Sequence, residues 1–177
     1  CKGLKMAYTY GQQIWNALML DIGNEYGVAG LMGNLEAESA LNPINLENGY
    51  EASSGFTDET YTQAVDSGTY TENQFVNDWY GYGLAQWTFP SRKQGLYDMK
   101  KTMGVSIGDV NLACAYLLHE LKTTYSDVYD VLKTATDIRT ASDKVLHDFE
   151  NPLVQDTAVE IYRAGLGTAL YVIYTGS

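Results

Sequence analysis

The feature that most constrains the fold is the helical spacing of apolar residues over most of the chain. Apolar residues three or four positions apart share one face of a helix. Stripes of this kind lie at residues 14–22, 28–38, 96–103, 110–121, 128–132, 138–149 and 159–170. The pattern therefore predicts a mainly α protein, and the strongest apolar face, at residues 110–121, is expected to form the central helix.

Glycine and proline mark where these helices end. Gly23 and Gly27 bracket an expected break after the first helix. The second helix is expected from about Tyr26 to Ala40, because the proline of Asn42-Pro43 disfavours continuation. In the same way, Gly104 is expected to end the helix at 96–103, and Pro152 the one at 138–149.

Residues 44–79 have no such periodicity. This segment is rich in Gly, Ser, Thr, Asn and Tyr and contains the turn signals Asn48-Gly49 and Ser67-Gly68. It is long for a loop inside a compact domain, which is typical of a functional excursion. We therefore predict an irregular or short-β lobe inserted between helices two and three.

The composition restricts what the chain can bind. A net charge of -11, from 22 acidic and 11 basic residues, argues against nucleic acid and against adhesion to anionic membranes. The 15 tyrosines, against 4 phenylalanines, suit a wet groove that holds sugars, although most single tyrosines pack in a core or on a surface. No apolar run approaches the length of a membrane span.

The length of 177 residues fits one domain, covering residues 1–177. Because the chain begins without Met, we expect a domain excised from a larger multidomain protein.

The cysteines and histidines predict no metal site and no cofactor. Cys114 lies in an apolar run and is expected to be a buried free thiol, while a bridge from Cys1 to Cys114 stays open. His119 and His147 lack neighbours in a metal-ligand pattern. Cys114 and His119 also point about 140° apart on one helix, which argues against a peptidase pair.

A carboxylate lies at the end of the apolar face of the second helix. Val28, Leu31, Leu35 and Glu38 share that face by spacing. Glu36 lies about 200° away around the helix from Glu38, and it is expected to point toward solvent. Glu38 is therefore the candidate for chemistry, and Glu36 is its control.

The expected surroundings of Glu38 suit a general acid. The last turn of a helix is the negative end of its dipole, and burial beside Leu35 and Leu41 also disfavours a charge. Both effects favour the protonated form that a general acid must have. From this segment alone, a surface glutamate, or one that satisfies a loop amide, is an equally good interpretation.

A second segment, at residues 80–88, places two glycines among aromatic residues. Glycine lets the backbone approach a ligand closely, and Tyr80, Tyr82 and Trp87 offer stacking faces. Taken alone, the segment is better interpreted as a turn with aromatic packing.

The two segments together resemble a known enzyme signature. Glu38-Ser39, followed by Asn42-Pro43, resembles the Glu-Ser-x-x-Asn-Pro motif of goose-type lysozymes and lytic transglycosylases. Residues 83–86, Gly-Leu-Ala-Gln, resemble their downstream Gly-Leu-Met-Gln motif. With Met-Gly-Asn at 32–34 and Gln-Trp-Thr at 86–88, the sequence is most similar to the phage tail lysozyme family over residues 30–92.

This resemblance implies a lysozyme-like fold with a groove between the second helix and residues 80–88. It implies that Glu38 protonates the β-1,4 bond between N-acetylmuramic acid and N-acetylglucosamine, and that Ser39 orients it or lines the groove. Residues 83–86 would form the groove floor, with Gln86 and Tyr82 at the cleavage site. The substrate-binding residues expected on this basis are Ser39, Tyr80, Tyr82, Gly83, Leu84, Gln86 and Trp87.

The second catalytic residue is less defined. Glycoside hydrolysis normally uses two carboxylates, and Glu47 is the nearest candidate on the loop. It is followed by Glu51, Asp58, Glu59, Asp66 and Asp78, and each is more often a solvated charge than a catalyst.

Two alternatives to hydrolysis stay open. With one carboxylate the enzyme would be a lytic transglycosylase that forms 1,6-anhydromuramic ends. Ala85, in place of the motif's Met, and the long segment between the motifs leave this choice open. The other alternative is a non-catalytic glycan-binding domain with the same fold.

The resemblance also implies an extracellular setting at the bacterial cell wall, in a phage particle, a phage lysin or a cell-surface protein. The expected partner is the peptidoglycan glycan strand. A linked peptidase or wall-binding domain is expected outside this piece of sequence.

Overall fold

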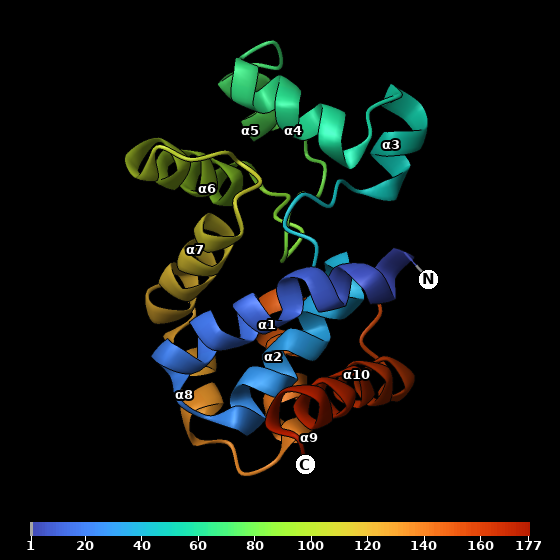
Figure 1. Cartoon of the computed structure of the whole chain (residues 1–177), viewed down its shortest axis with the longest axis vertical. Coiled ribbons are helices and arrows are strands. Elements are labelled where there is room, and N and C mark those ends of the chain that lie inside the picture. The colour runs from blue at the N-terminus through green and yellow to red at the C-terminus, as the bar shows by residue number, and fades with distance from the viewer. Residues whose placement is uncertain (1) are drawn as a thin grey trace. The chain divides into compact units, whose positions relative to one another are not determined.

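The computed structural model describes the backbone of residues 2–177 and the side chains of residues 9–177. The chain divides into two compact units, one formed by residues 1–41 and 117–177 and the other by residues 42–116 (Figure 1). The expected mainly α class is confirmed. Among the described residues no sheet is formed, and pairing is limited to the isolated bridges Leu46–Tyr82 and Tyr82–Trp87.

The first unit is a cluster of helices around α2 (Figure 1). Its elements are α1 (Lys2–Ile22), α2 (Glu25–Ser39), α8 (Ser126–Thr134), α9 (Ile138–Val145), the π-helical turn η1 (Leu146–Glu150), α10 (Thr157–Thr175) and the end of α7 (Val110–Lys122). Helix α2 packs against α1, α8, α9 and α10. It is therefore α2, and not the expected helix at 110–121, that is central in this unit.

Three glycines let the neighbouring helices approach α2. A Cβ on Gly27 would lie 1.9 Å from the carbonyl oxygen of Leu132, and one on Gly33 would lie 2.5 Å from that of Arg163. Gly30 is equally confined, against α9. The expectation that Gly27 marks a break is therefore wrong, because this glycine serves close packing inside the helix, while Gly23 forms the break with φ +68°.

The ends of α2 lie within one residue of the expected positions, for partly different reasons. At its start, the Asn24 side chain accepts a hydrogen bond from the amide of Tyr26. At its end, Ala40 and Leu41 both adopt left-handed conformations, with φ of 54° and 57°. The helix therefore ends in a sharp turn at these two residues, before the chain reaches Pro43.

The second unit contains α3 (Asn48–Ser54), α4 (Asp58–Ser67), α5 (Glu72–Asn77), α6 (Pro90–Met103) and the beginning of α7. The predicted irregular or short-β lobe is wrong, since three short helices occupy most of residues 44–79. Thr57 and Thr71 begin α4 and α5 with reciprocal capping boxes, and Gly55 and Gly68 end α3 and α4 in left-handed conformations. Four of the residues that suggested a loop are therefore helix caps, and others lie inside the short helices.

Other helix ends follow the sequence. Gly104, with φ 67°, ends α6 as expected. The helix expected at 138–149 is α9 continued by η1, and Asn151 ends it in a left-handed conformation just before Pro152.

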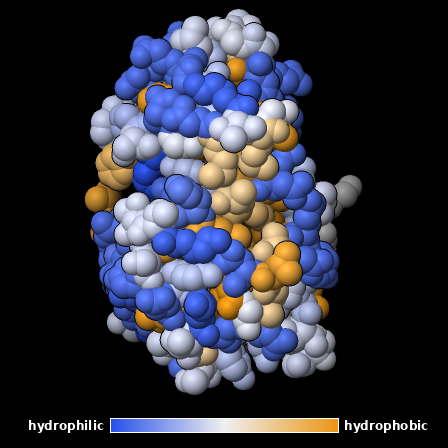
Figure 2. Space-filling model, turned by 90° about the vertical axis from the view of Figure 1, so that its left-hand side faces the viewer, coloured by the Kyte–Doolittle hydropathy of each residue, from blue (hydrophilic) through white to orange (hydrophobic). Residues whose placement is uncertain are grey.

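None of the helices within the described residues combines the length and apolar character that a bilayer crossing requires. Hydrophilic residues cover most of the face drawn in Figure 2, with apolar residues among them.

Candidate active site

Glu38 lies in the last turn of α2, and its side chain is 20% exposed. Its Oε1 accepts a hydrogen bond from Nη2 of Arg163 in α10 at 2.6 Å. No hydrogen bond to Oε2 is found among the residues that the structure describes. One carboxylate oxygen is therefore fixed by Arg163, and the other accepts no hydrogen bond from the described residues.

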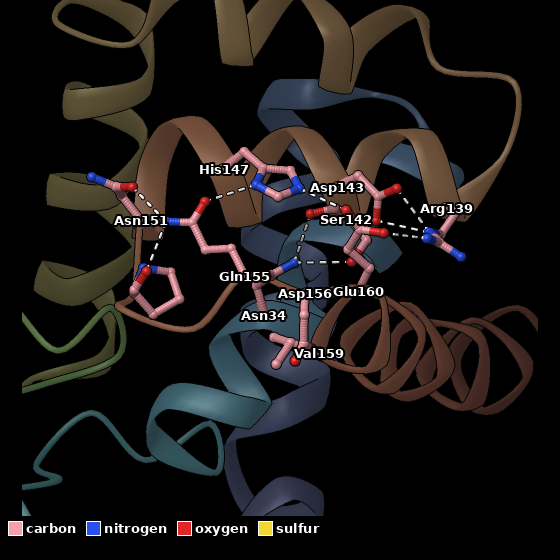
Figure 3. Close-up of polar contacts among 11 residues, drawn as sticks. Asn34, Arg139, Ser142, Asp143, His147, Asn151, Gln155, Asp156, Val159 and Glu160 are labelled. Carbon is pink, nitrogen blue, oxygen red and sulfur yellow. Dashed lines mark hydrogen bonds and ion pairs between the residues drawn. The ribbon is translucent and has the colours of Figure 1, made fainter.

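A chain of buried hydrogen bonds holds Arg163 in place. Its Nη1 donates to Oδ1 of Asn34 at 3.2 Å, and Asn34 is fully buried in α2. The Asn34 amide in turn donates to both the carbonyl and the hydroxyl of Ser142 in α9, each at 3.1 Å (Figure 3). Because α2, α9 and α10 all contribute, the position of the Glu38 carboxylate depends on the packing of the whole unit.

Arg163 was not found by the sequence argument, and it places a positive charge beside Glu38. The surroundings expected for Glu38, a helix end and apolar neighbours, did not include this cation. A signal was present in the sequence, because Arg163 interrupts the apolar stripe of α10 four residues after Val159 and three before Leu166. Its partner Glu38 is 125 positions away.

Glu36 is less solvated than expected. It has intermediate exposure, and burial raises the pKa of its carboxyl group. A half-buried carboxylate of this kind is itself a candidate acid. Glu36 is therefore the necessary control in any test of Glu38.

Ser39 is buried, and its hydroxyl donates to the carbonyl of Leu35 at 3.0 Å. This bond occupies a carbonyl in the last turn of α2. This bond fixes the side chain at the end of α2. The groove-lining or orienting role that the resemblance implied for Ser39 stays a prediction.

Two of the expected stacking residues are part of the core of the second unit. Tyr82 and Trp87 have no exposed surface. The Tyr82 hydroxyl forms a hydrogen bond with that of Thr62 at 2.6 Å, and the Trp87 ring packs against Tyr116. Leu84 is equally buried. Their rings fill the space beneath the segment and present no open stacking face. Whether Tyr82 and Trp87 contribute to substrate binding stays a prediction.

The backbone of residues 81–83 is paired with the segment that follows the first motif. The Gly83 amide donates to the carbonyl of Asn45 at 2.9 Å, and the Glu47 amide donates to that of Gly81 at 2.8 Å. The partly exposed side chain of Gln86 strengthens this link, since its Nε2 donates to Asn45 at 2.9 Å and to Gly83 at 3.0 Å. Residues 45–47 and 81–86 therefore form one fixed loop cluster.

Glu47 takes part in this cluster through its carboxylate. Its Oε2 accepts a hydrogen bond from the Gly81 amide at 2.9 Å, while the residue as a whole is exposed. Glu47 thus holds the backbone next to Tyr80. Whether it also performs chemistry stays a prediction.

Asp78 belongs to a buried cluster. Its Oδ1 lies 2.5 Å from Nζ of Lys93, and its Oδ2 accepts hydrogen bonds from the hydroxyls of Tyr61 and Tyr70 at 2.6 and 3.0 Å. Lys93 is fully buried, and it also donates to the carbonyl of Tyr80 at 2.9 Å. Burial lowers the pKa of Lys93, against the opposing attraction of Asp78. The cluster connects α4, α5 and α6.

Asp58, at the start of α4, has the most perturbed carboxyl group for which a value is resolved. Burial, followed by neighbouring carboxylates such as Glu51, raises its pKa to about 6, although the bond from the Leu46 amide at 2.8 Å opposes this. Its second oxygen accepts a hydrogen bond from the Asn42 side chain at 3.3 Å. Asp58 thereby fixes residues 42–46, which follow the first motif.

Two exposed aromatic residues flank the second motif, and the sequence argument overlooked them. Trp79 is 55% exposed and Phe89 is 57% exposed. Their rings meet edge to face, with centroids 5.5 Å apart. Their position immediately outside residues 80–88 was the available signal.

His147 forms a polar cluster on the first unit. Its Nδ1 and Nε2 lie 2.8 Å from Gln155 and from Glu160, which also pairs with Arg139 (Figure 3). These hydrogen bonds raise the pKa of His147. Among the side chains that the structure describes, no group of three or more His, Cys, Asp or Glu could hold a metal ion.

Cys114 is buried, as expected, and burial raises the pKa of its thiol to about 12. Cys1 lies outside the described residues, so the possible bridge between the two is not tested.

Comparison with protein families gives one match, to the family described as phage tail lysozyme, over residues 10–166. No curated protein and no solved structure matches the chain at a significant level. The matched region contains both motifs, Arg163 and every helix except the first turns of α1 and the end of α10. The chain therefore belongs to the phage tail lysozyme family, which indicates a lysozyme-like protein that acts on bacterial peptidoglycan.

Proposed function

We propose that the chain cleaves the β-1,4 bond between N-acetylmuramic acid and N-acetylglucosamine in peptidoglycan, with Glu38 as the general acid. The observation that carries this proposal is the geometry of Glu38. Its carboxylate is at the surface end of a helix, is fixed through one oxygen by Arg163, and has the other oxygen free of protein hydrogen bonds within the described residues. A preorganised, partly exposed carboxylate of this kind suits catalysis.

The ion pair with Arg163 serves this reaction by holding the carboxylate in one orientation. As a general acid, Glu38 gives a proton to the glycosidic oxygen. The free Oε2 is the oxygen that would carry the proton to the glycosidic oxygen.

The role of a second carboxylate separates the two forms of cleavage. In the second unit, Glu47, Asp58 and Asp78 each accept hydrogen bonds that fix the surrounding structure. This engagement favours the second candidate function, a lytic transglycosylase, in which one carboxylate serves as acid and then as base. Hydrolysis remains the first proposal, with Glu47 as the candidate second carboxylate.

The test is mass spectrometry of glycan fragments released from purified peptidoglycan by the wild type, Glu38→Gln and Glu36→Gln. We expect the cleavage rate of Glu38→Gln to be at least about a hundredfold lower than that of the wild type. Circular dichroism should show that the variant and the wild type are equally folded. The control Glu36→Gln should retain activity, because this substitution leaves the pair of Glu38 and Arg163 intact.

The products then identify the reaction. New reducing ends indicate hydrolysis, and 1,6-anhydromuramic ends indicate a transglycosylase. Retained activity in Glu38→Gln combined with loss in Glu36→Gln would transfer the role of the acid to Glu36. Tight glycan binding by a wild type that releases no fragments would favour the binding-only alternative.

We further propose that the protein works outside the cytoplasm, at the cell wall, as part of a phage particle, a lysin or a cell-surface protein. A linked peptidase or wall-binding domain would complete such an assembly. The family match supports this setting.

A further inference from the structure

Trp79 and Phe89 form an exposed aromatic pair on the second unit. More than half of each side chain is accessible, and the rings stand at 83° to one another. The other two tryptophans, Trp15 and Trp87, are 6% and 0% exposed. Exposing large aromatic side chains to water is unfavourable, and clusters of them at the surface commonly mark binding sites.

The backbone at Trp79 is strained, and its surroundings enforce that strain. Trp79 has φ of 64°, a left-handed conformation that costs a non-glycine residue about 1–2 kcal/mol. On the following residue, Asp78 Oδ1 accepts the Tyr80 amide hydrogen at 3.0 Å, and Lys93 donates to the Tyr80 carbonyl at 2.9 Å. Strain that buried groups maintain is typical of a residue held for function.

The next side chain is held equally firmly. The Tyr80 ring stacks on that of Tyr50 with centroids 3.7 Å apart and an angle of 3° between the planes. Tyr50 also contacts the rings of Phe56 and Tyr61. The aromatic pair therefore projects from a rigid base, so that little conformational entropy is lost when a ligand stacks on it.

We propose that Trp79, supported by Phe89, is a stacking subsite for an N-acetylated sugar ring of the glycan strand. The apolar face of a pyranose ring matches a flat indole. Two hydrogen-bonding side chains lie nearby: Tyr80, which is partly exposed and follows Trp79 in the sequence, and Glu47, which is exposed and belongs to the loop cluster. The net charge of -11 disfavours anionic ligands such as nucleic acid on this surface. This subsite rests on the proposed function, because it names a contact for the same substrate.

Tryptophan fluorescence provides the direct test, since Trp79 is the tryptophan that solvent reaches. An N-acetylglucosamine oligosaccharide is titrated into the Glu38→Gln protein, which binds without cleaving. We expect a blue shift and an intensity change that saturate with ligand. The same titration of Glu38→Gln with Trp79→Phe should show neither, because Trp15 and Trp87 remain buried.

Binding to insoluble peptidoglycan, measured by co-sedimentation in the Glu38→Gln background, gives the size of the effect. We expect Trp79→Ala to weaken binding about tenfold, as for a central aromatic contact, and Trp79→Phe to weaken it less. Met103→Ala is the matched control, because Met103 is an apolar side chain of the same unit that is 40% exposed. It should leave binding unchanged.

A purely structural role for Trp79 makes a different prediction. Trp79→Gly relieves the left-handed strain, so its thermal midpoint should be at or above that of Trp79→Ala while binding stays weak. Unchanged binding in Trp79→Ala would overturn the subsite, and so would a loss of binding that follows only a loss of folding. An active Glu38→Gln protein would overturn the proposed acid, while the difference in glycan binding between Trp79 and Trp79→Ala in the same background would still decide the subsite.

Discussion

Each of the two units contains a carboxylate paired with a cation, and the two pairs are built differently. In the second unit, Lys93 is fully buried and the Asp78 side chain is 6% exposed. Both oxygens of Asp78 are bonded, to Lys93 and to two tyrosines. In the first unit, Arg163 is 9% and Glu38 20% exposed, and the described protein groups bond one oxygen of the carboxylate.

Under the proposed function, the difference separates a structural pair from a reactive one. A charge pair removed from water is tolerated only when its hydrogen-bonding capacity is satisfied inside the protein. Asp78 meets this condition and has no capacity left for a ligand. Glu38 is held in position through one oxygen, and its other oxygen accepts no hydrogen bond from the described residues, which suits the proposed transfer of a proton.

The largest effect on stability is expected from Lys93→Met. Methionine fills a similar volume, but it leaves the Asp78 carboxylate buried without its cation, which costs about 3–5 kcal/mol. Unfolding in urea, followed by tyrosine and tryptophan fluorescence, would measure this loss. A cost below about 1 kcal/mol would mean that the tyrosines alone satisfy Asp78, and the comparison between the two pairs would fail.

Arg163→Met should have a smaller effect on stability and a larger effect on catalysis. Glu38 can regain hydration at the surface, so we expect a cost of about 1–2 kcal/mol. The carboxylate loses its fixed position, which should lower kcat/KM about tenfold to a hundredfold.

Wall-suspension clearing would measure the loss of activity, and denaturation in urea the loss of stability. Arg139→Met is the matched control, because Arg139 is an exposed arginine of the same unit paired with Asp143 and Glu160. Its activity should equal that of the wild type. Wild-type activity in Arg163→Met would exclude a positioning role of Arg163 for Glu38.

The smallest effect is expected from Asp58→Asn, and it depends on pH. The pKa of Asp58 is about 6 in the folded protein against an ordinary 3.8, so the folded state holds the proton more tightly. Stability should therefore fall as pH rises from about 4 to about 6. The full shift corresponds to about 3 kcal/mol, which partial exposure of the group reduces to about 1 kcal/mol.

Asparagine keeps an acceptor for the Leu46 amide and cannot ionise. Relative to the wild type, Asp58→Asn should gain stability across that pH window, above a constant offset from the altered bond with Asn42. Denaturation at pH 4, 5, 6 and 7 would show it. If the free energies of unfolding of the two proteins changed in parallel with pH, the pKa of Asp58 in the folded protein would be its ordinary value.

Much of the helical architecture could be predicted from the sequence. The period of the apolar residues identified the helices of the first unit and those after residue 90, because burying one face of a helix requires that spacing. The end of α2, the stop at Gly104 and the buried thiol of Cys114 followed from local chemistry. The pair of motifs at Glu38 and at residues 80–88 was sufficient to suggest the family that the comparison then showed.

The sequence failed where local and tertiary signals differ. Threonine and glycine in residues 44–79 have the composition of a loop, and only the backbone shows that they cap three short helices. In the second motif, the sequence could not tell exposed aromatic residues from buried ones. Tyr82 and Trp87 are inside, whereas Trp79 is at the surface.

The sequence by itself determined which carboxylate to examine, because helical spacing places Glu38 at the end of an apolar face. The tertiary structure decided what surrounds that carboxylate. Arg163 reaches Glu38 from 125 positions away, through a helix whose approach depends on Gly33 and on a buried asparagine. A local pattern contains no information about such a partner, since the contact exists only when α2, α9 and α10 have packed together.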